Sequence, residues 1–201
     1  NVKVSGSVIG SEIVGGVVGT NTGKVDYAEN MATVIGKLGN ENNILGGVVG
    51  YNTSSGQIRA AANAGQITGN FYYAGGIAGK NEGSIYNAYN SGAIAATNKP
   101  QAFGGIVGYS TNGNNIGYVY NYGGISNQNG SIAGQFVGQI EGSTGLTLPR
   151  FYYATTASAT NSYDKGCDQK PDAMKPATTY IFNTTSIYAG WNLAANNQYL
   201  D

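Results

Sequence analysis

The chain has 201 residues, and its ten Lys or Arg and ten Asp or Glu side chains give a formal net charge of zero. This low and balanced charge argues against a nucleic-acid partner, which requires a face rich in Lys and Arg, and against an anionic membrane surface. The lack of His and the single Cys, Cys167, exclude Ser-His-Asp and Cys-His catalysis, His metal sites, Cys metal clusters and an intrachain disulfide.

No apolar run approaches the roughly 18 residues that a membrane span requires, and no signal peptide is recognisable. We therefore expect no membrane insertion. Glycine accounts for 33 of the 201 residues, about twice the usual share of roughly 7%.

A fixed repeat organises the sequence. Near-copies of one phrase read GGVVG from Gly15, GGVVG from Gly46, GGIAG from Gly75, GGIVG from Gly104 and, in degenerate form, GQFVG from Gly134. The phrases begin 29 to 31 residues apart. A fixed period in this range is typical of an array in which each repeat is one supersecondary unit.

Each unit contains three short apolar runs separated by Gly, Asn or Ser, which are turn residues. No run has apolar residues at helical spacing over ten or more positions, so we expect no helix in the array. In chain order, the two runs that follow each phrase occupy 21–25 and 27–34, 52–58 and 60–67, 81–85 and 86–94, and 110–116 and 118–125.

Three strands and three bends per unit form one coil of a parallel β-helix, in which each strand pairs with its counterpart one coil further along. The predicted fold class is therefore all-β: a single-stranded parallel β-helix, or solenoid, of five to six coils with an irregular C-terminal cap. We assign residues 1–150 to the array and residues 151–201 to the final coil and cap of the same domain.

The repeat predicts which side chains stack in the interior. The predicted columns are Val17, Val48, Ile77, Ile106 and Phe136; Val25, Ile58, Ile85 and Ile116; Val34, Ile67, Ile94 and Ile125; and the narrow column Ala28, Ala61, Ala88 and Val119.

Asn30, Asn63, Asn90 and Asn121 also align, and stacked Asn side chains can form an amide hydrogen-bond ladder. The paired glycines of each phrase permit either a bend with positive φ or a close approach of adjacent coils.

The repeats resemble the GLUG-motif family of bacterial surface and secreted proteins. The resemblance covers roughly residues 10–140, and it is carried by GGIVGY (104–109), GGIAGKNEGSI (75–85) and YNAYNSGAI (86–94). The Cys of that family is replaced by Ala28, Ala61, Ala88 and Val119. FYYATTAS (151–158) and the stretch 172–193 resemble segments that often close such arrays.

The resemblance implies a right-handed parallel β-helix on the bacterial exterior, either at the cell surface or secreted. Similar arrays occur in adhesins and as non-catalytic modules of large secreted enzymes, including IgA-specific metallopeptidases. The HExxH motif of those peptidases is absent because the chain has no His, so an enzyme activity would lie elsewhere in a longer parent chain.

Parallel β-helices also host polysaccharide lyases and hydrolases, which need clustered carboxylates. No acidic pair recurs on neighbouring coils, and Asp26, Glu29 and Arg59 form the best cluster, which a surface ion pair explains. Asp164, Asp168 and Asp172 have the spacing of a charged helix face; the alternative is a loop that holds Ca²⁺ through carboxylates and carbonyls, although the spacing is not the DxDxDG pattern. We therefore predict no catalytic residues, no metal site and no cofactor.

Aromatic residues are the better candidates for ligand binding, since Tyr has an apolar ring and a polar tip that suit sugars and protein partners. One group falls on equivalent strands of successive coils, where it forms either a binding strip or a stiffening ladder. It comprises Tyr86, Tyr89, Tyr118, Tyr120 and Tyr122, followed by 151–153.

The second group, Phe71, Tyr72 and Tyr73, lies in a connection that precedes a GG phrase. These connections vary most between repeats, and binding sites are commonly placed there. The alternative is a strand that enters the phrase.

The sequence thus predicts a non-catalytic extracellular bacterial module that acts as an adhesin-like surface or stalk domain, with a host or matrix glycan or protein as partner. The alternatives are a glycan-binding or glycan-degrading β-helix module and a spacer of a larger secreted enzyme.

Overall fold

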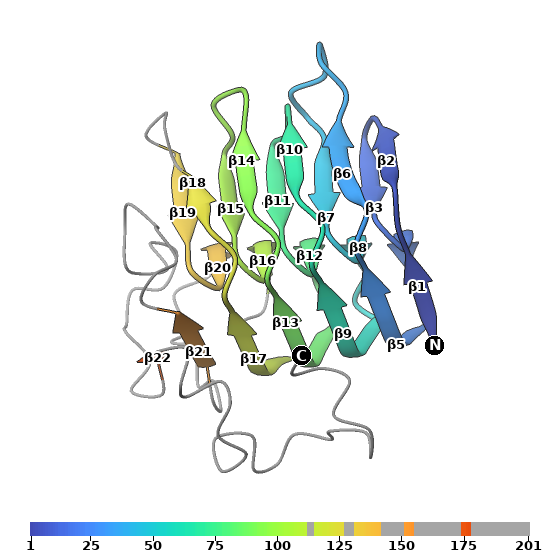
Figure 1. Cartoon of the computed structure of the whole chain (residues 1–201), viewed down its shortest axis with the longest axis vertical. Coiled ribbons are helices and arrows are strands. Elements are labelled where there is room, and N and C mark those ends of the chain that lie inside the picture. The colour runs from blue at the N-terminus through green and yellow to red at the C-terminus, as the bar shows by residue number, and fades with distance from the viewer. Residues whose placement is uncertain (112–114, 127–130, 142–150, 155–173, 178–201) are drawn as a thin grey trace.

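The computed structural model describes residues 1–111, 115–126 and 131–141, and the backbone of 151–154 and 174–177. The chain winds into a β-solenoid in which every strand pairs in parallel with its counterpart in the next coil (Figure 1). The described residues contain no α-helix. The predicted all-β parallel solenoid is therefore confirmed.

Four parallel sheets, which we call A to D, run along the solenoid. Sheet A contains β1 (Val2–Val4), β5 (Lys24–Asn30), β9 (Gln57–Asn63), β13 (Ser84–Asn90), β17 (Ile116–Asn121), β21 (Phe151–Ala154) and β22 (Met174–Ala177). Sheet B contains β2 (Ser7–Gly10), β6 (Thr33–Gly36), β10 (Ile67–Gly69), β14 (Ile94–Ala96) and β18 (Ile125–Ser126). Sheet C contains β3 (Ile13–Gly15), β7 (Ile44–Gly46), β11 (Tyr73–Gly75), β15 (Ala102–Gly104) and β19 (Ile132–Gly134). Sheet D contains β4 (Val18–Asn21), β8 (Val49–Asn52), β12 (Ala78–Asn81), β16 (Val107–Ser110) and β20 (Val137–Ile140).

Each coil has four strands, so the prediction of three strands per coil was wrong. The GG phrase supplies two of them, because the chain bends within the phrase and divides it between sheets C and D. The solenoid makes about four turns, slightly fewer than the five to six coils predicted. Most of the predicted cap lies outside the described residues, as do Cys167, Asp164, Asp168 and Asp172.

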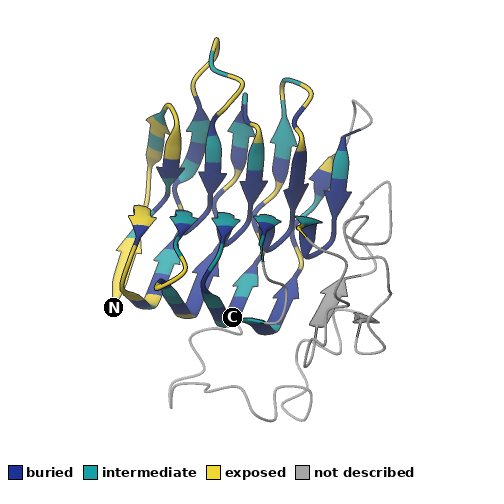
Figure 2. Cartoon of the chain, turned by 180° about the vertical axis from the view of Figure 1, so that it is seen from behind, coloured by how far each residue is buried: buried dark blue, intermediate teal, exposed yellow. Residues whose placement is uncertain are grey.

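The four strands of a coil enclose two separate hydrophobic cores. Sheets A and D cover one core, which contains Val48, Ile58 and Ile106, and sheets B and C cover the other, which contains Val34 and Leu45. These five side chains are completely buried. Figure 2 shows buried positions along the inside of the coils and exposed positions in the first coil.

The predicted columns are confirmed by the strand register. Ile58 pairs with Val25 on one side and with Ile85 on the other, and Ile67 lies between Val34 and Ile94. Stacking of equivalent apolar side chains removes them from water in a way that no single coil achieves.

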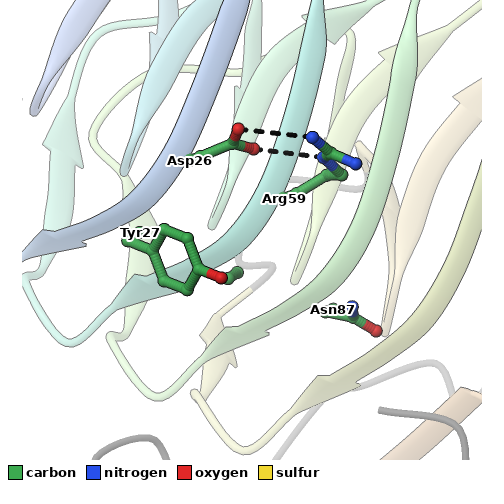
Figure 3. Close-up of a pocket in the computed structure, with 5 residues that line it drawn as sticks. Asp26, Tyr27, Arg59 and Asn87 are labelled. Atoms are coloured by element: carbon green, nitrogen blue, oxygen red, sulfur yellow. Dashed lines mark hydrogen bonds and ion pairs between the residues drawn. The ribbon is translucent and has the colours of Figure 1, made fainter. Parts of the chain in front are cut away.

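A column of left-handed residues bends the strands of sheet A. Tyr27, Ala60, Asn87 and Tyr118 occupy equivalent positions and have φ values of 56°, 51°, 55° and 53°. Tyr27 and Asn87 are seen on the outer face of sheet A in Figure 3. Since only one of these four residues, Asn87, belongs to a type that adopts this conformation readily, the sequence carries little sign of the bend.

The paired glycines are required by close packing and not by positive φ. Positive φ values among the described glycines occur at Gly6, Gly39 and Gly69, so the suggested positive φ at the phrase was wrong. A Cβ on Gly105 would collide with the carbonyl oxygen of Gln135. The other explanation offered by the sequence, close approach of adjacent coils, therefore holds.

Two ladders of buried polar side chains run along the solenoid. In the predicted ladder, the Nδ2 atoms of Asn30, Asn63 and Asn90 donate to the Oδ1 atom of the next Asn over 2.8, 2.8 and 2.9 Å. Its last member, Asn121, donates to Oε1 of Gln135 over 3.3 Å. The amide ladder is thus confirmed.

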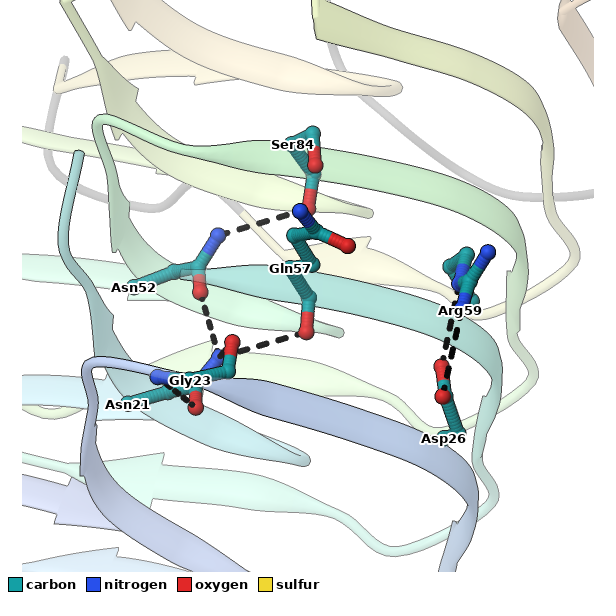
Figure 4. A network of polar contacts seen from close by, with 7 residues as sticks. All are labelled: Asn21, Gly23, Asp26, Asn52, Gln57, Arg59 and Ser84. Atoms are coloured by element: carbon teal, nitrogen blue, oxygen red, sulfur yellow. Dashed lines mark hydrogen bonds and ion pairs between the residues drawn. The ribbon is translucent and has the colours of Figure 1, made fainter. Parts of the chain in front are cut away.

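The second ladder was not predicted from the sequence. Asn21 donates to Asn52 and Asn52 to Asn81, each over 2.8 Å, and Asn81 donates to the hydroxyl of Ser110 over 3.5 Å. Figure 4 shows Asn21 and Asn52 linked in this way. Both ladders satisfy buried amides that would otherwise cost free energy.

Candidate ligand-binding surfaces

The tyrosines predicted on sheet A lie where expected, but one of them is almost completely buried. Tyr89 on β13 and Tyr120 on β17 stack with their ring centroids 4.9 Å apart and their planes at 2°. Tyr120 is only 7% exposed. The pair therefore has the geometry of a stiffening ladder. Tyr86 and Tyr118 are half-buried on the same two strands.

Tyr122, which directly follows β17, is 44% exposed and is more accessible than Tyr86, Tyr89, Tyr118 and Tyr120. Because Tyr120, one half of the ring stack, is buried, sheet A exposes less aromatic surface to solvent than the sequence suggests. The side chains of 151–153 lie outside the described residues.

Phe71 belongs to the core, and its prediction as a ligand-binding residue was wrong. Its side chain is completely buried between sheets B and C and meets Phe103 edge to face, with ring centroids 5.9 Å apart. The surrounding core is apolar, so burying the large ring there stabilises the fold more than leaving it exposed to water in a loop. The sequence could not tell which residues of this connection point inward.

Tyr72 and Tyr73 lie outside the core, where Tyr73 meets a third tyrosine that was not predicted from the sequence. Tyr73 stacks on Tyr109, with centroids 4.8 Å apart and planes at 25°. Tyr72 meets Tyr73 edge to face, with ring centroids 4.7 Å apart and planes at 68°, and Tyr72 is 40% exposed. The Tyr73–Tyr109 stack thus supports the more exposed Tyr72 ring.

Tyr109 belongs to a row of outward side chains on sheet D. The residue that directly follows each GG phrase occupies this row, so the repeat period contains the signal that could have identified it. The row is Thr20, Tyr51, Lys80, Tyr109 and Gln139.

Sheets C and D meet in a tight corner beside this row. The last glycine of the phrase makes the corner possible, because a Cβ on Gly50 or Gly79 would lie 2.7 Å from the side chain of Ile13 or Ile44, respectively. Contact across the corner explains why Tyr73 on sheet C reaches Tyr109 on sheet D. We call the following side chains the corner surface: Tyr51, Tyr72, Tyr73, Lys80, Glu82, Tyr109 and Glu141.

One half of the corner surface is organised around Lys80. Its ammonium group lies 2.8 Å from Glu82 and 4.8 Å from the ring centroid of Tyr51. Hydrogen bonds from Lys80 and Tyr51 lower the pKa of the Glu82 carboxyl. Burial, and then the bond to Glu82, raise the pKa of the Tyr51 phenol. Glu82 therefore stays ionised and holds both partners in place.

The other half is organised around Tyr109. Its hydroxyl donates to Oε2 of Glu141 over 2.7 Å. Burial, followed by this hydrogen bond, raises the pKa of the Tyr109 phenol, and burial likewise raises the pKa of Tyr73. Both phenols remain neutral donors at neutral pH.

A shallow pocket of about 160 Å³ lies on the outer face of sheet A, where Asp26, Tyr27, Arg59, Ala60 and Asn87 line it (Figure 3). Arg59 Nε lies 3.2 Å from Asp26 Oδ1, and the pair is well exposed. The carboxylate raises the pKa of the already cationic guanidinium. This arrangement is an ordinary surface ion pair, as the sequence suggested for Asp26 and Arg59.

Within the described residues, no group of three or more His, Cys, Asp or Glu side chains is close enough to hold a metal ion. Those residues also form no helix with the length and apolar character of a membrane span. No protein-family model, curated protein or solved structure matches the chain. The resemblance to GLUG-motif repeats therefore stays a prediction.

Proposed function

We propose that this chain is a non-catalytic extracellular module of a bacterial surface or secreted protein, and that it acts as an adhesin-like domain with the corner surface as its binding face. The observation that carries the proposal is Tyr72, a residue that is 40% exposed and whose ring packs edge to face on the Tyr73–Tyr109 stack. A large aromatic ring that is held rigidly yet faces solvent is the kind of anchor that dominates binding energy.

The scaffold favours this role. The stacked coils and the two polar ladders fix the strands that carry Tyr51, Tyr73, Lys80 and Tyr109, and Tyr72, Glu82 and Glu141 each lie within two residues of such a strand. Such a preorganised surface loses little conformational entropy when a partner binds.

Three of the six carboxylates in the described coils are paired with separate cations, which favours a non-catalytic role. Asp26 pairs with Arg59, Glu29 with Lys3 and Glu82 with Lys80. Glycoside hydrolysis instead requires two carboxylates that face one substrate, one of which holds a proton. Carboxylates neutralised by separate cations are poor candidates for that task.

Binding of the purified chain to an array of glycans and extracellular-matrix proteins tests the proposal, with the Tyr72→Ala, Tyr73→Ala double variant as the probe. We expect the parent to bind at least one ligand and the double variant to lose at least about tenfold in affinity. The matched control is Tyr27→Ala, since Tyr27 is also exposed and Ala already occupies the equivalent position at Ala60.

Full binding by a folded double variant would remove the corner surface from the proposal, and an absence of any ligand would favour a spacer. Depolymerisation of a polysaccharide by the purified chain would overturn the non-catalytic role and favour the glycan-degrading alternative.

A further inference from the structure

Aromatic rings and carboxylates alternate along the corner surface in a pattern that suits one class of ligand. Tyr51, Lys80 and Tyr109 follow one another in register on sheet D, and Glu82 and Glu141 lie beside them. We propose that the corner surface binds a neutral glycan whose chain runs along this row. The inference rests on the proposed function and names the class of ligand.

The rings supply the apolar half of the site. The face of a pyranose ring carries C–H groups that pack on aromatic rings, while its edge carries hydroxyl groups. Tyr72 lies at 68° to Tyr73, so its plane is turned away from the internal stack. Its exposed ring is the platform on which a sugar would pack.

The carboxylates supply the polar half of the site. Glu141 accepts the Tyr109 hydroxyl through Oε2, and Glu82 accepts from Lys80 and Tyr51. A carboxylate has about four acceptor positions, so each retains capacity for hydroxyl groups of a sugar. Bonds of this kind are stronger than those between neutral groups because the acceptor is ionised.

The charge of the surface disfavours acidic glycans. Lys80 contributes one positive charge and already pairs with Glu82, while Glu141 adds a second negative charge. The balance is negative, so an anionic polysaccharide would be repelled. A protein partner is a poorer match, because the centres of protein interfaces are depleted in charged residues.

The row also predicts how affinity depends on ligand length. Adjacent coils lie about 4.8 Å apart, so Tyr51 and Tyr109, two coils apart, are separated by roughly 10 Å. That span exceeds a single sugar ring. Oligosaccharides should therefore bind more tightly than the corresponding monosaccharide.

The experiment measures binding of the purified chain to neutral polysaccharides and oligosaccharides of glucose, mannose, xylose and N-acetylglucosamine, and to polygalacturonate and heparin as anionic probes. Affinity electrophoresis followed by isothermal titration is suitable. We expect binding to at least one neutral glycan, with an affinity that is nearly independent of salt from about 0.01 M to 1 M.

Variants then locate the site. Tyr109→Ala should weaken binding by about tenfold or more, whereas Tyr109→Phe, which keeps the ring and loses the hydroxyl, should weaken it less. Tyr72→Ala serves as an independent probe in case Tyr109→Ala does not fold, because Tyr72 is more exposed. Tyr27→Ala on sheet A is the control and should bind as the parent does.

The outcomes separate this inference from the proposed function. Preferential binding of polygalacturonate or heparin, unchanged glycan binding by folded Tyr72→Ala and Tyr109→Ala, or binding of a matrix protein alone through Tyr72 and Tyr73 would overturn the neutral-glycan assignment. The last result would leave the adhesin-like function standing. Failure to bind any glycan or protein would overturn both.

Discussion

The first prediction concerns the buried amide ladder at Asn63. The side chain is completely buried, and its Nδ2 atom donates to Oδ1 of Asn90 over 2.8 Å and to the carbonyl oxygen of Gly65 over 2.9 Å. Its Oδ1 atom accepts from Asn30 over 2.8 Å. Asn63→Ala removes three buried hydrogen bonds at once.

A typical buried hydrogen bond contributes about 1 kcal/mol net, so the variant should lose roughly 3 kcal/mol of unfolding free energy. The loss is not larger because Asn30 keeps its bond to the carbonyl oxygen of Ala32, and Asn90 keeps its acceptance from the backbone N–H of Gly92. Urea unfolding followed by circular dichroism measures this free energy, provided that the m-value is unchanged.

The matched control is Asn42→Ala, since Asn42 is exposed in a turn, and its change should stay within about 0.5 kcal/mol. A double-mutant cycle of Asn63→Ala with Asn90→Ala should give non-additive changes because the two residues share a bond. An Asn63→Ala variant as stable as the control, or strictly additive changes, would refute the reasoning that the ladder stabilises the coils.

Three further predictions concern glycine packing, the left-handed column and the tyrosine hydroxyl. Gly105→Ala should destabilise the folded chain by several kcal/mol, because the new Cβ would collide with neighbouring backbone. Thermal unfolding measures the effect, and a melting temperature within about a degree or two of the parent's would contradict the prediction. Ala60→Gly should leave the free energy of unfolding unchanged or raise it by up to about 1 kcal/mol, because φ is 51° at this position. Ala88→Gly, in a buried strand position, should lower the free energy of unfolding by about 1 kcal/mol. Equal losses in the two variants would argue against backbone strain at Ala60. Burial and Glu141 raise the pKa of the Tyr109 phenol. An ultraviolet pH titration should therefore show one fewer late-ionising tyrosine in Tyr109→Phe than in the parent. The stability that this pKa shift contributes is present below the unfolded pKa of about 10 and is lost as the pH rises through the folded pKa.

The repeat period alone identified much of the interior. Positions such as Ile58 and Ile85, or Asn63 and Asn90, can be matched by aligning the repeats with one another, and they pair in that register. The reason is physical: in a parallel solenoid each residue lies beside its counterpart one period along the chain, so sequence alignment of the repeats is also spatial alignment.

The bends within one coil could not be predicted in the same way. The phrase from Gly46 reads as one apolar run, yet it is divided between β7 and β8. The division depends on contacts of the phrase with the next coil, such as the approach of Gly47 to the backbone of Gly76. Short apolar runs carry no periodicity that marks such a bend.

The candidate site shows the same limit. The sequence drew attention to Phe71, Tyr72 and Tyr73 together, but the folded chain buries Phe71 against Phe103 and brings Tyr73 onto Tyr109. Equivalence of residues from coil to coil follows from the period, and so it can be read from the amino-acid order. The meeting of neighbouring sheets at the corner does not follow from the period, because it depends on how closely the glycines let the backbones approach in the packed solenoid.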